Sequence, residues 1–346
     1  MEIERPDLSQ TDTQVIAYIE ALEAELELLK AGRKKVDSMP PQVPLLPDEP
    51  PTSLNLITIS ENGTAKRTPR HLYSRQRRGG MGIFDLDTSD KEIPRVLSIA
   101  DENQSLLLFT NTARVFRIPV HSIPEAPVHS RGASITSRFG LLEDEKLVAA
   151  LPDRAKGNVA MVSERGMVRS LRHHVFGEYM KQGTGLYDVK QFGRLRAVCW
   201  TLGDSDLFIA TQMGRAIRFS EKLVPPQGGP GIKIDSGDSA VAVSPVYSES
   251  GVFLLTSDGR GTIRSMVGFN PNKSAGGSGK IAMSTTNLVG AITVDQDEDI
   301  FVISRLSKII RFMAAEVPEK EGVVQGVSCM SLRADETVAL VASKPA

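Results

Sequence analysis

After residue 53 the sequence repeats a unit of about fifty residues six times, and this repeat constrains the fold more than any other feature. The first half of each unit begins with an apolar run rich in β-forming residues, continues through a polar turn, and ends with an apolar residue followed by a basic one. The first unit reads LITISENGTAKRT at 56–68, and the sixth reads FVISRLSKIIRF at 301–312. The recurring basic position is occupied by Lys66, Arg117, Arg169, Arg218, Arg264 and Arg311.

The second half of each unit repeats as well. A Gly-containing loop, such as RRGGMG at 77–82 or EGVVQG at 321–326, is followed by another apolar run, such as RVLSIAD at 95–101 or TVALVAS at 337–343. Short strands at regular spacing with a period near 50 predict an all-β propeller of four-stranded blades over residues 54–346. Six blades are enough to close a ring, and they could equally form an open spiral.

The segment before the repeats predicts a helix and a linker. Within residues 1–37, apolar residues at 15, 19, 22, 26 and 29 follow the 4, 3, 4, 3 spacing of a coiled coil. A helix this short is marginal alone in water, so its apolar stripe needs a partner. It either associates with another protein or a second copy, or packs on its own domain. Residues 38–53 contain six prolines and predict a semi-rigid spacer.

Composition limits the compartment and the class of partner. No apolar run approaches the roughly 20 residues of a membrane span, and the acidic N-terminus lacks the basic and apolar regions of a signal peptide. Cys199 and Cys329 are isolated, so we expect a reduced, cytoplasmic protein. Residues 1–53 carry a net charge of −6 and the remainder +5, although the total is only −1. A local basic patch can therefore bind a polyanion despite the near-zero total.

The most basic stretch of the chain lies at the start of the repeats. Residues 66–78 contain no acid and six cations, namely Lys66, Arg67, Arg70, Arg75, Arg77 and Arg78. Glycines follow at 79, 80 and 82. Arginine forks suit phosphate oxygens, and glycines allow a backbone to approach a ligand closely. The alternative is a solvated Gly-rich loop whose charges only aid solubility.

The repeats and this stretch together resemble the C-terminal domain of DNA gyrase A, a six-bladed β-pinwheel. The family's gyrase-A box is a Gln-Arg-Arg-Gly-Gly-basic-Gly heptad in the first blade. Here that heptad is Gln76, Arg77, Arg78, Gly79, Gly80, Met81 and Gly82. The resemblance covers residues 54–341, and Met81 departs from it by replacing a basic residue.

The resemblance implies that double-stranded DNA binds the outer rim and wraps with positive handedness, with the box required for wrapping. The implied contacts are the box residues Gln76, Arg77, Arg78, Gly79, Gly80 and Gly82, with Arg75, Lys66, Arg67, Arg70 and the other recurring cations. Those recurring cations could instead be ordinary solvent-facing strand positions. A rival interpretation is a propeller scaffold for protein–protein contacts that has lost DNA wrapping, which Met81 and the modest +5 charge favour.

Catalysis is not expected. The sequence shows no counterpart of the family's breakage–reunion domain, and none of its five tyrosines follows an arginine as the cleavage tyrosine of that family does. The only P-loop-like stretch, around Lys280, lacks the first glycine and the Ser/Thr. We also expect no metal or other cofactor, because His173 and His174 are neighbours in a strand and have no other ligand at suitable spacing. The expected partners are nucleoid DNA and, through the N-terminal helix, a second copy or a topoisomerase.

Overall fold

The computed structural model describes residues 49–88, 92–137, 139–247 and 250–344. These residues belong to one compact unit, Pro47–Ala346. The expected helix within 1–37, and the linker up to residue 48, lie outside the described residues. The helices within the described ranges are too short or too polar to cross a membrane.

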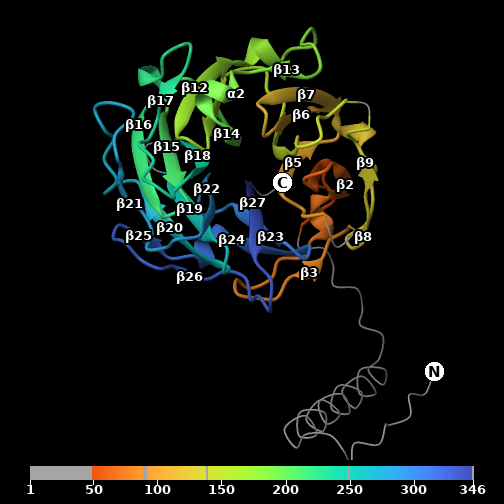
Figure 1. Ribbon diagram of the computed structural model, residues 1–346. Coiled ribbons are helices and arrows are strands. Elements are labelled where there is room, and N and C mark those ends of the chain that lie inside the picture. Colours follow the sequence, from red (N-terminus) through yellow and green to blue (C-terminus); the bar gives the residue numbers. More distant parts are fainter. Residues whose placement is uncertain (1–48, 89–91, 138, 248–249, 345–346) are drawn as a thin grey trace, which may run out of the picture. The chain divides into compact units, whose positions relative to one another are not determined.

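The described repeats form six small sheets arranged in a ring, which confirms the predicted six-bladed β-propeller (Figure 1). The inner strands are β5 (Val96–Asp101), β10 (Leu147–Pro152), β14 (Leu195–Thr201), β18 (Ala240–Val246), β22 (Leu288–Val294) and β27 (Thr337–Ser343). The second strands are β1 (Leu54–Ile59), β6 (Ser105–Thr110), β11 (Asn158–Ser163), β15 (Asp206–Thr211), β19 (Gly251–Thr256) and β23 (Asp299–Ser304). The third strands are β2 (Thr64–Pro69), β7 (Arg114–Pro119), β12 (Met167–Arg172), β16 (Arg215–Ser220), β20 (Arg260–Ser265) and β24 (Lys308–Met313).

In the first five sheets the outer strand is only two residues long and comes from the next unit along the chain. These strands are β9 (Ala133–Ser134), β13 (Thr184–Gly185), β17 (Gly229–Pro230), β21 (Lys280–Ile281) and, in the fifth blade, β26 (Val327–Ser328). The fifth blade has an additional strand, β25 (Glu319–Lys320), which pairs in parallel with β20. The Gly-containing loops of the sequence therefore supply the outer edge of the ring.

The ring is closed by the first unit. Its loop supplies β3 (Ile83–Phe84), which pairs antiparallel with β24 of the sixth blade. The two ends of the array thus meet in one sheet, with β27 of that blade lying against β5 of the first. The structure therefore resolves the alternatives of ring and spiral in favour of the closed ring.

Short connections complete the chain. Five of the third strands lead into a 3₁₀ turn, and these turns are η1 (Arg70–Leu72), η2 (Val120–Ser122), η3 (His173–Phe176), η4 (Glu221–Leu223) and η5 (Ala314–Glu316). The remaining elements are α2 (Val189–Phe192) and a parallel pair formed by β4 (Leu86–Asp87) and β8 (Ser130–Arg131).

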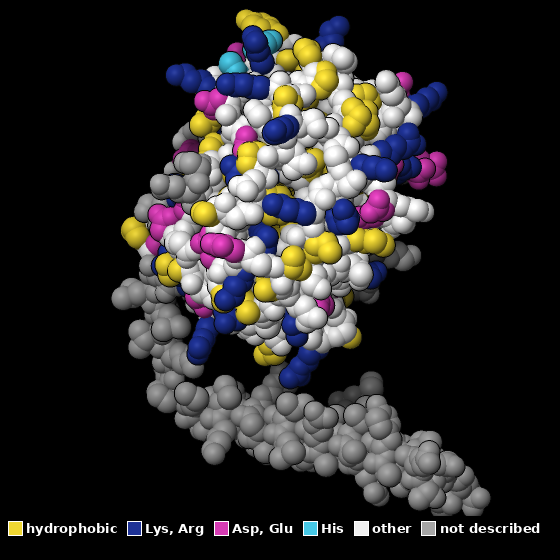
Figure 2. Space-filling view, turned by 90° about the vertical axis from the view of Figure 1, so that its left-hand side faces the viewer, with side chains coloured by type: hydrophobic (Ala, Val, Ile, Leu, Met, Phe, Trp, Pro, Cys, Tyr) yellow, Lys and Arg dark blue, Asp and Glu magenta, His cyan; other side chains and the backbone are white. Residues whose placement is uncertain are grey.

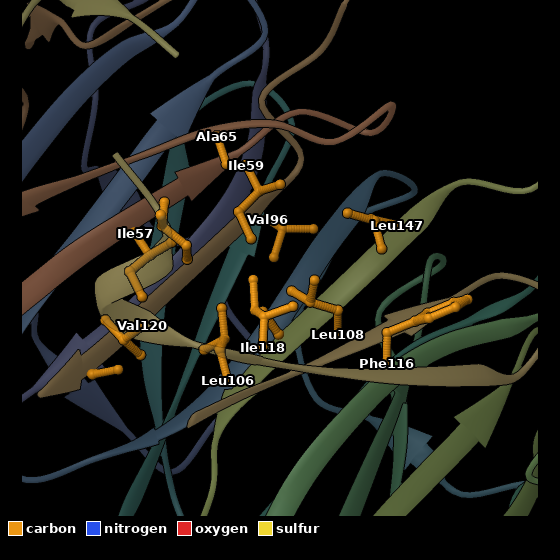
Figure 3. Close-up of a cluster of buried hydrophobic side chains, with 13 residues drawn as sticks. Ile57, Ile59, Ala65, Val96, Leu106, Leu108, Phe116, Ile118, Val120 and Leu147 are labelled. Carbon is orange, nitrogen blue, oxygen red and sulfur yellow. The ribbon is translucent and has the colours of Figure 1, made fainter. Parts of the chain in front are cut away.

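The core lies between neighbouring blades. Second strands are buried on both faces, which explains why they read as continuous apolar runs and not as an alternating pattern. Between the first two blades, Ile57 and Ile59 belong to one buried cluster with Leu106, Leu108 and Phe116 (Figure 3). Each fully buried side chain of this kind contributes roughly 1.5–3 kcal/mol. Every blade thus depends on its neighbours, as expected for a repeat array.

Candidate nucleic-acid interface

The gyrase-A-like box belongs to the first unit in sequence but lies on the sixth blade in space. The Gln76 N–H donates to the Arg311 carbonyl at 2.7 Å, and the Gly79 N–H donates to the Cys329 carbonyl at 2.8 Å. The Gly80 carbonyl accepts from the Ser331 N–H at 2.9 Å. The box backbone is therefore fixed on the ring before any ligand binds.

Glycine is required at Gly82, the last position of the box. Its φ of +70° is unfavourable for residues with a side chain. A Cβ at this position would also lie 2.7 Å from the Ile309 carbonyl oxygen. Gly82 thus lets the chain come close enough to the sixth blade for β3 to pair with β24.

The three arginines around the box have different roles in the structure. Arg78 Nε donates to the Glu316 carbonyl at 2.7 Å, and Nη1 donates to the Ser328 carbonyl at 3.0 Å. Arg75 Nε lies 2.8 Å from Asp299 Oδ1. Arg77 is exposed, and within the described ranges no hydrogen bond or ion pair engages its side chain. Arg77 is therefore the box arginine that is available to a ligand.

Other box residues also differ in exposure. The side chain of Gln76 is half-buried, and Gly79 and Gly80 are partly covered. Met81, at the position where the family has a basic residue, is 54% exposed. Ile83 and Phe84 of β3 are exposed beside it, and Lys308 Nζ lies 5.5 Å from the centre of the Phe84 ring.

The six recurring basic residues do not form a solvent-facing row. Lys66, Arg264 and Arg311 are buried, and Arg117, Arg169 and Arg218 are half-buried. Carboxylates pair with four of them, in the pairs Lys66–Asp85, Arg117–Asp153, Arg218–Asp206 and Arg311–Asp299. Arg169 and Arg264 donate to the carbonyls of Leu186 and Gly322. In the structure these cations are engaged by carboxylates and backbone carbonyls of the protein, which differs from the expectation that they lie open on the rim.

Arg67 and Arg70 are engaged in the same way. Arg67 is half-buried, and its guanidinium lies 2.7 Å from Glu125. Arg70 is fully buried and pairs with Glu49, at the end of the linker. Burial alone would raise the pKa of Glu49, but hydrogen bonds and charges from Arg70 and Arg311 outweigh burial and lower this pKa to about 2.

A different set of cations lies at the outer edge of the ring. An exposed lysine or arginine occurs in or near the outer strand of every blade, and these residues are Arg77, Arg131, Lys181, Lys233, Lys280 and Lys320. Arg131 pairs with exposed Asp87, and Lys280 Nζ lies 4.1 Å from the centre of the Phe269 ring. Apart from Arg77, sequence reasoning missed this set. The sequence feature that could have identified these residues is a basic residue in or beside each Gly-containing loop.

The charge of the outer edge is not uniform. Figure 2, which views the side of the ring where β16, β21 and β25 lie in Figure 1, shows lysines and arginines interspersed with acidic and hydrophobic side chains. The edge of the fifth blade carries exposed Glu319 and Glu321 on either side of Lys320. By contrast, residues 267–281 of the fourth blade hold two lysines and no acid. An acidic segment thus separates the fourth blade from the box.

The described residues contain no group of three or more His, Cys, Asp or Glu side chains that could hold a metal ion. A central channel of about 810 Å³ is lined mainly by the apolar side chains of the inner strands, including Val148, Val198 and Leu340. Burial raises the pKa of the Cys199 thiol in this channel, which disfavours its reactive thiolate form.

Comparison with known proteins agrees with the fold. A family model described as "DNA gyrase C-terminal domain, beta-propeller" matches residues 54–93, 104–152 and 205–246. DNA gyrase A of Staphylococcus epidermidis is 30% identical over 302 residues, which cover 83% of this chain and 34% of the relative. DNA gyrase A of Mycobacterium leprae is 26% identical over 301 residues, covering 83% and 24%. The chain thus spans about a third or less of these relatives.

Two solved structures share the fold. The C-terminal domain of DNA gyrase A has a TM-score of 0.72 at 19% identity, covering 83% of this chain and 98% of that one. The C-terminal domain of DNA topoisomerase IV has a TM-score of 0.62 at 18% identity, covering 84% and 94%. The six blades, the matching family model and the 30% identical relative agree that the chain is homologous to the C-terminal domain of DNA gyrase A.

Proposed function

We propose that this protein binds duplex DNA along the outer edge of its ring and wraps it without catalysing a reaction. One observation carries the proposal: Arg77 of the box is exposed and unengaged within the described ranges, on an edge where every blade carries an exposed cation. Each phosphate that these cations neutralise releases counterions and adds affinity that does not depend on sequence.

Wrapping requires contacts that recur along the DNA. Bending 20–30 base pairs through 40–90° costs on the order of 1–6 kcal/mol, so a single patch of charge would hold DNA without curving it. A closed ring with one exposed cation in each blade supplies the recurrence. The residues that we propose to contact DNA are therefore Arg77, Arg131, Lys181, Lys233 and Lys280. They take the place of most of the recurring third-strand cations. The wrap is proposed to be positive and to alter DNA topology in the nucleoid, alone or with a topoisomerase that binds the N-terminal segment.

Salt dependence tests this function. Fluorescence anisotropy of a labelled duplex of mixed sequence should give a steep fall in affinity with salt, with a log–log slope of about −0.9 for each phosphate neutralised. Contacts from several blades predict a slope steeper than about −3. A protein that does not bind this duplex at 50 mM salt contradicts the proposal.

A protein–protein scaffold is the second candidate. It is favoured by the exposed apolar group Met81, Ile83 and Phe84, which occupies the edge of the sixth blade. Exposed apolar groups at one place are typical of interaction surfaces. A scaffold predicts that the protein binds a partner with little dependence on salt and leaves the duplex free.

A further inference from the structure

A buried cluster of charges lies beside the box. Glu49 Oε1 accepts from Arg70 Nε at 3.0 Å, and Glu49 Oε2 lies 2.7 Å from Arg311 Nη2. Asp299 receives Arg311 Nη2 at 2.6 Å and Arg75 Nε at 2.8 Å. The side chains of Arg70, Arg311 and Asp299 are at most 1% exposed, and that of Glu49 is 7% exposed. Each of these buried charges is therefore stabilised by its oppositely charged neighbours and not by water.

The cluster joins four segments that are distant in sequence. Glu49 lies in the last part of the Pro-rich linker, and Arg70 lies in η1, just before the box. Arg311 belongs to β24 of the sixth blade, and its Nη1 donates to the Tyr73 carbonyl at 2.8 Å. Arg70 Nη1 donates to Ser343 Oγ of β27 at 2.6 Å and also to the Lys344 carbonyl. The linker, the first unit, the last blade and the C-terminal strand thus meet at one point.

Charge balance gives Glu49 a specific role at this point. Arg70 and Arg311 share the carboxylates of Glu49 and Asp299. Without the charge of Glu49, these two buried guanidinium groups would keep Asp299 as their one carboxylate among the described residues. Removing one partner of a buried ion pair leaves an uncompensated charge that destabilises its surroundings strongly. The destabilisation would be located at the pairing of β3 with β24, which closes the ring.

We propose that Glu49 is a positioning residue for the box, through which the end of the linker fastens the first unit to the sixth blade. Its carboxylate holds Arg70 and Arg311 in place. Arg311 in turn holds the box through its carbonyl, which accepts from the Gln76 N–H. The consequence for DNA rests on the proposed function, because a loosened box would present Arg77 without a fixed position. The role in ring closure does not rest on it.

Hydrogen exchange measured by mass spectrometry on the full chain tests this role without DNA. In Glu49→Gln, amides of residues 76–86 and 308–313 should exchange at least tenfold faster, while those of β11 and β15 keep their rates. The matched control is Glu125→Gln, which removes a carboxylate that pairs with Arg67 but is 54% exposed. This control should leave all blades unchanged. Glu49→Asp, which keeps the charge on a shorter side chain, should give a smaller increase confined to the same amides.

Two results would overturn the proposal. Unchanged exchange at residues 76–86 in Glu49→Gln would show that the linker does not secure the box. Equal acceleration in all six blades would show that Glu49 stabilises the whole fold and not the closure. A wild-type protein that binds no duplex would contradict the proposed function, whereas these exchange results would still decide the role of Glu49.

Discussion

Lys66 Nζ lies 2.7 Å from Asp85 Oδ1, and both side chains are completely buried. Asp85 also accepts from the hydroxyls of Tyr73 and Thr58, each at 2.6 Å. Asp85 directly follows β3, so the pair ties the first blade to the segment that closes the ring. The first of the recurring basic positions is therefore a structural ion pair, and the basic stretch of the sequence contains residues with unlike roles.

Lys66→Met is expected to destabilise the protein, because Asp85 would remain buried without its cation. The loss should be about 3–5 kcal/mol, measured as the free energy of unfolding in urea. Lys181→Met, which removes an exposed lysine from the second blade's outer edge, serves as the control and should change this free energy by less than about 0.5 kcal/mol. Equal stabilities of the two variants would show that Lys66 does not act as a core ion pair.

Two neighbouring box arginines should separate binding from stability. Arg77→Ala is expected to weaken duplex binding and to make the log–log salt slope shallower by about 0.9, the value for one phosphate contact. The melting temperature should not change, because the Arg77 side chain is exposed and makes no hydrogen bond or ion pair within the described ranges.

Arg78→Ala should lower stability by about 1–3 kcal/mol, because it leaves the Glu316 and Ser328 carbonyls without their donor. Calorimetry and anisotropy on both variants check the contrast. Loss of stability in Arg77→Ala, or none in Arg78→Ala, would reverse the roles assigned to them.

The repeat was sufficient to predict the blades, because second strands buried on both faces read as apolar runs at a fixed period. It could not predict that each outer strand comes from the next unit, since that pairing appears only when the ring closes. For the same reason, the sequence placed the box in the first blade, whereas its hydrogen bonds are with the sixth blade and with residues 328–331, at and after β26 of the fifth.

The buried recurring cations were missed for a different reason. An apolar residue followed by a basic one resembles the alternation of a half-exposed strand, and their acidic partners lie at irregular distances, as with Lys66 and Asp85. A regular signal does exist in two units. Asp206 precedes Arg218 by 12 residues, and Asp299 precedes Arg311 by the same interval, across paired strands. Opposite charges at a repeated spacing indicate an internal pair more than a ligand site.

The acidic edge of the fifth blade should weaken the DNA path. Glu321→Lys is expected to tighten duplex binding several-fold at low salt and to steepen the salt slope, because it replaces repulsion by attraction at the outer edge. Asp297→Lys is the matched control, since it adds the same charge in the exposed turn before β23. Equal gains from both variants, measured by anisotropy, would indicate a response to net charge and not to a path along the edge.

Acidification should remove the contribution of Glu49. Arg70 and Arg311 hold its pKa at about 2, below the ordinary value of 4.5. A lowered carboxyl pKa stabilises the folded protein fully above pH 4.5, and this contribution is lost as the pH falls toward 2. We expect Glu49→Gln to cost roughly 1–3 kcal/mol at pH 6 and progressively less below pH 4. Urea unfolding of both proteins from pH 3 to 6 measures the difference, and a constant difference would contradict this assignment.

DNA wrapping by the ring is tested most directly by the linking number of DNA closed in the presence of the protein. The purified protein is bound to a nicked circular plasmid, the nick is ligated, the protein is removed and the topoisomers are resolved on a gel. Wrapping predicts a shift toward positive linking difference that grows with protein concentration and is strongly reduced by Arg77→Ala. Binding of the plasmid without any shift in topoisomers would contradict it.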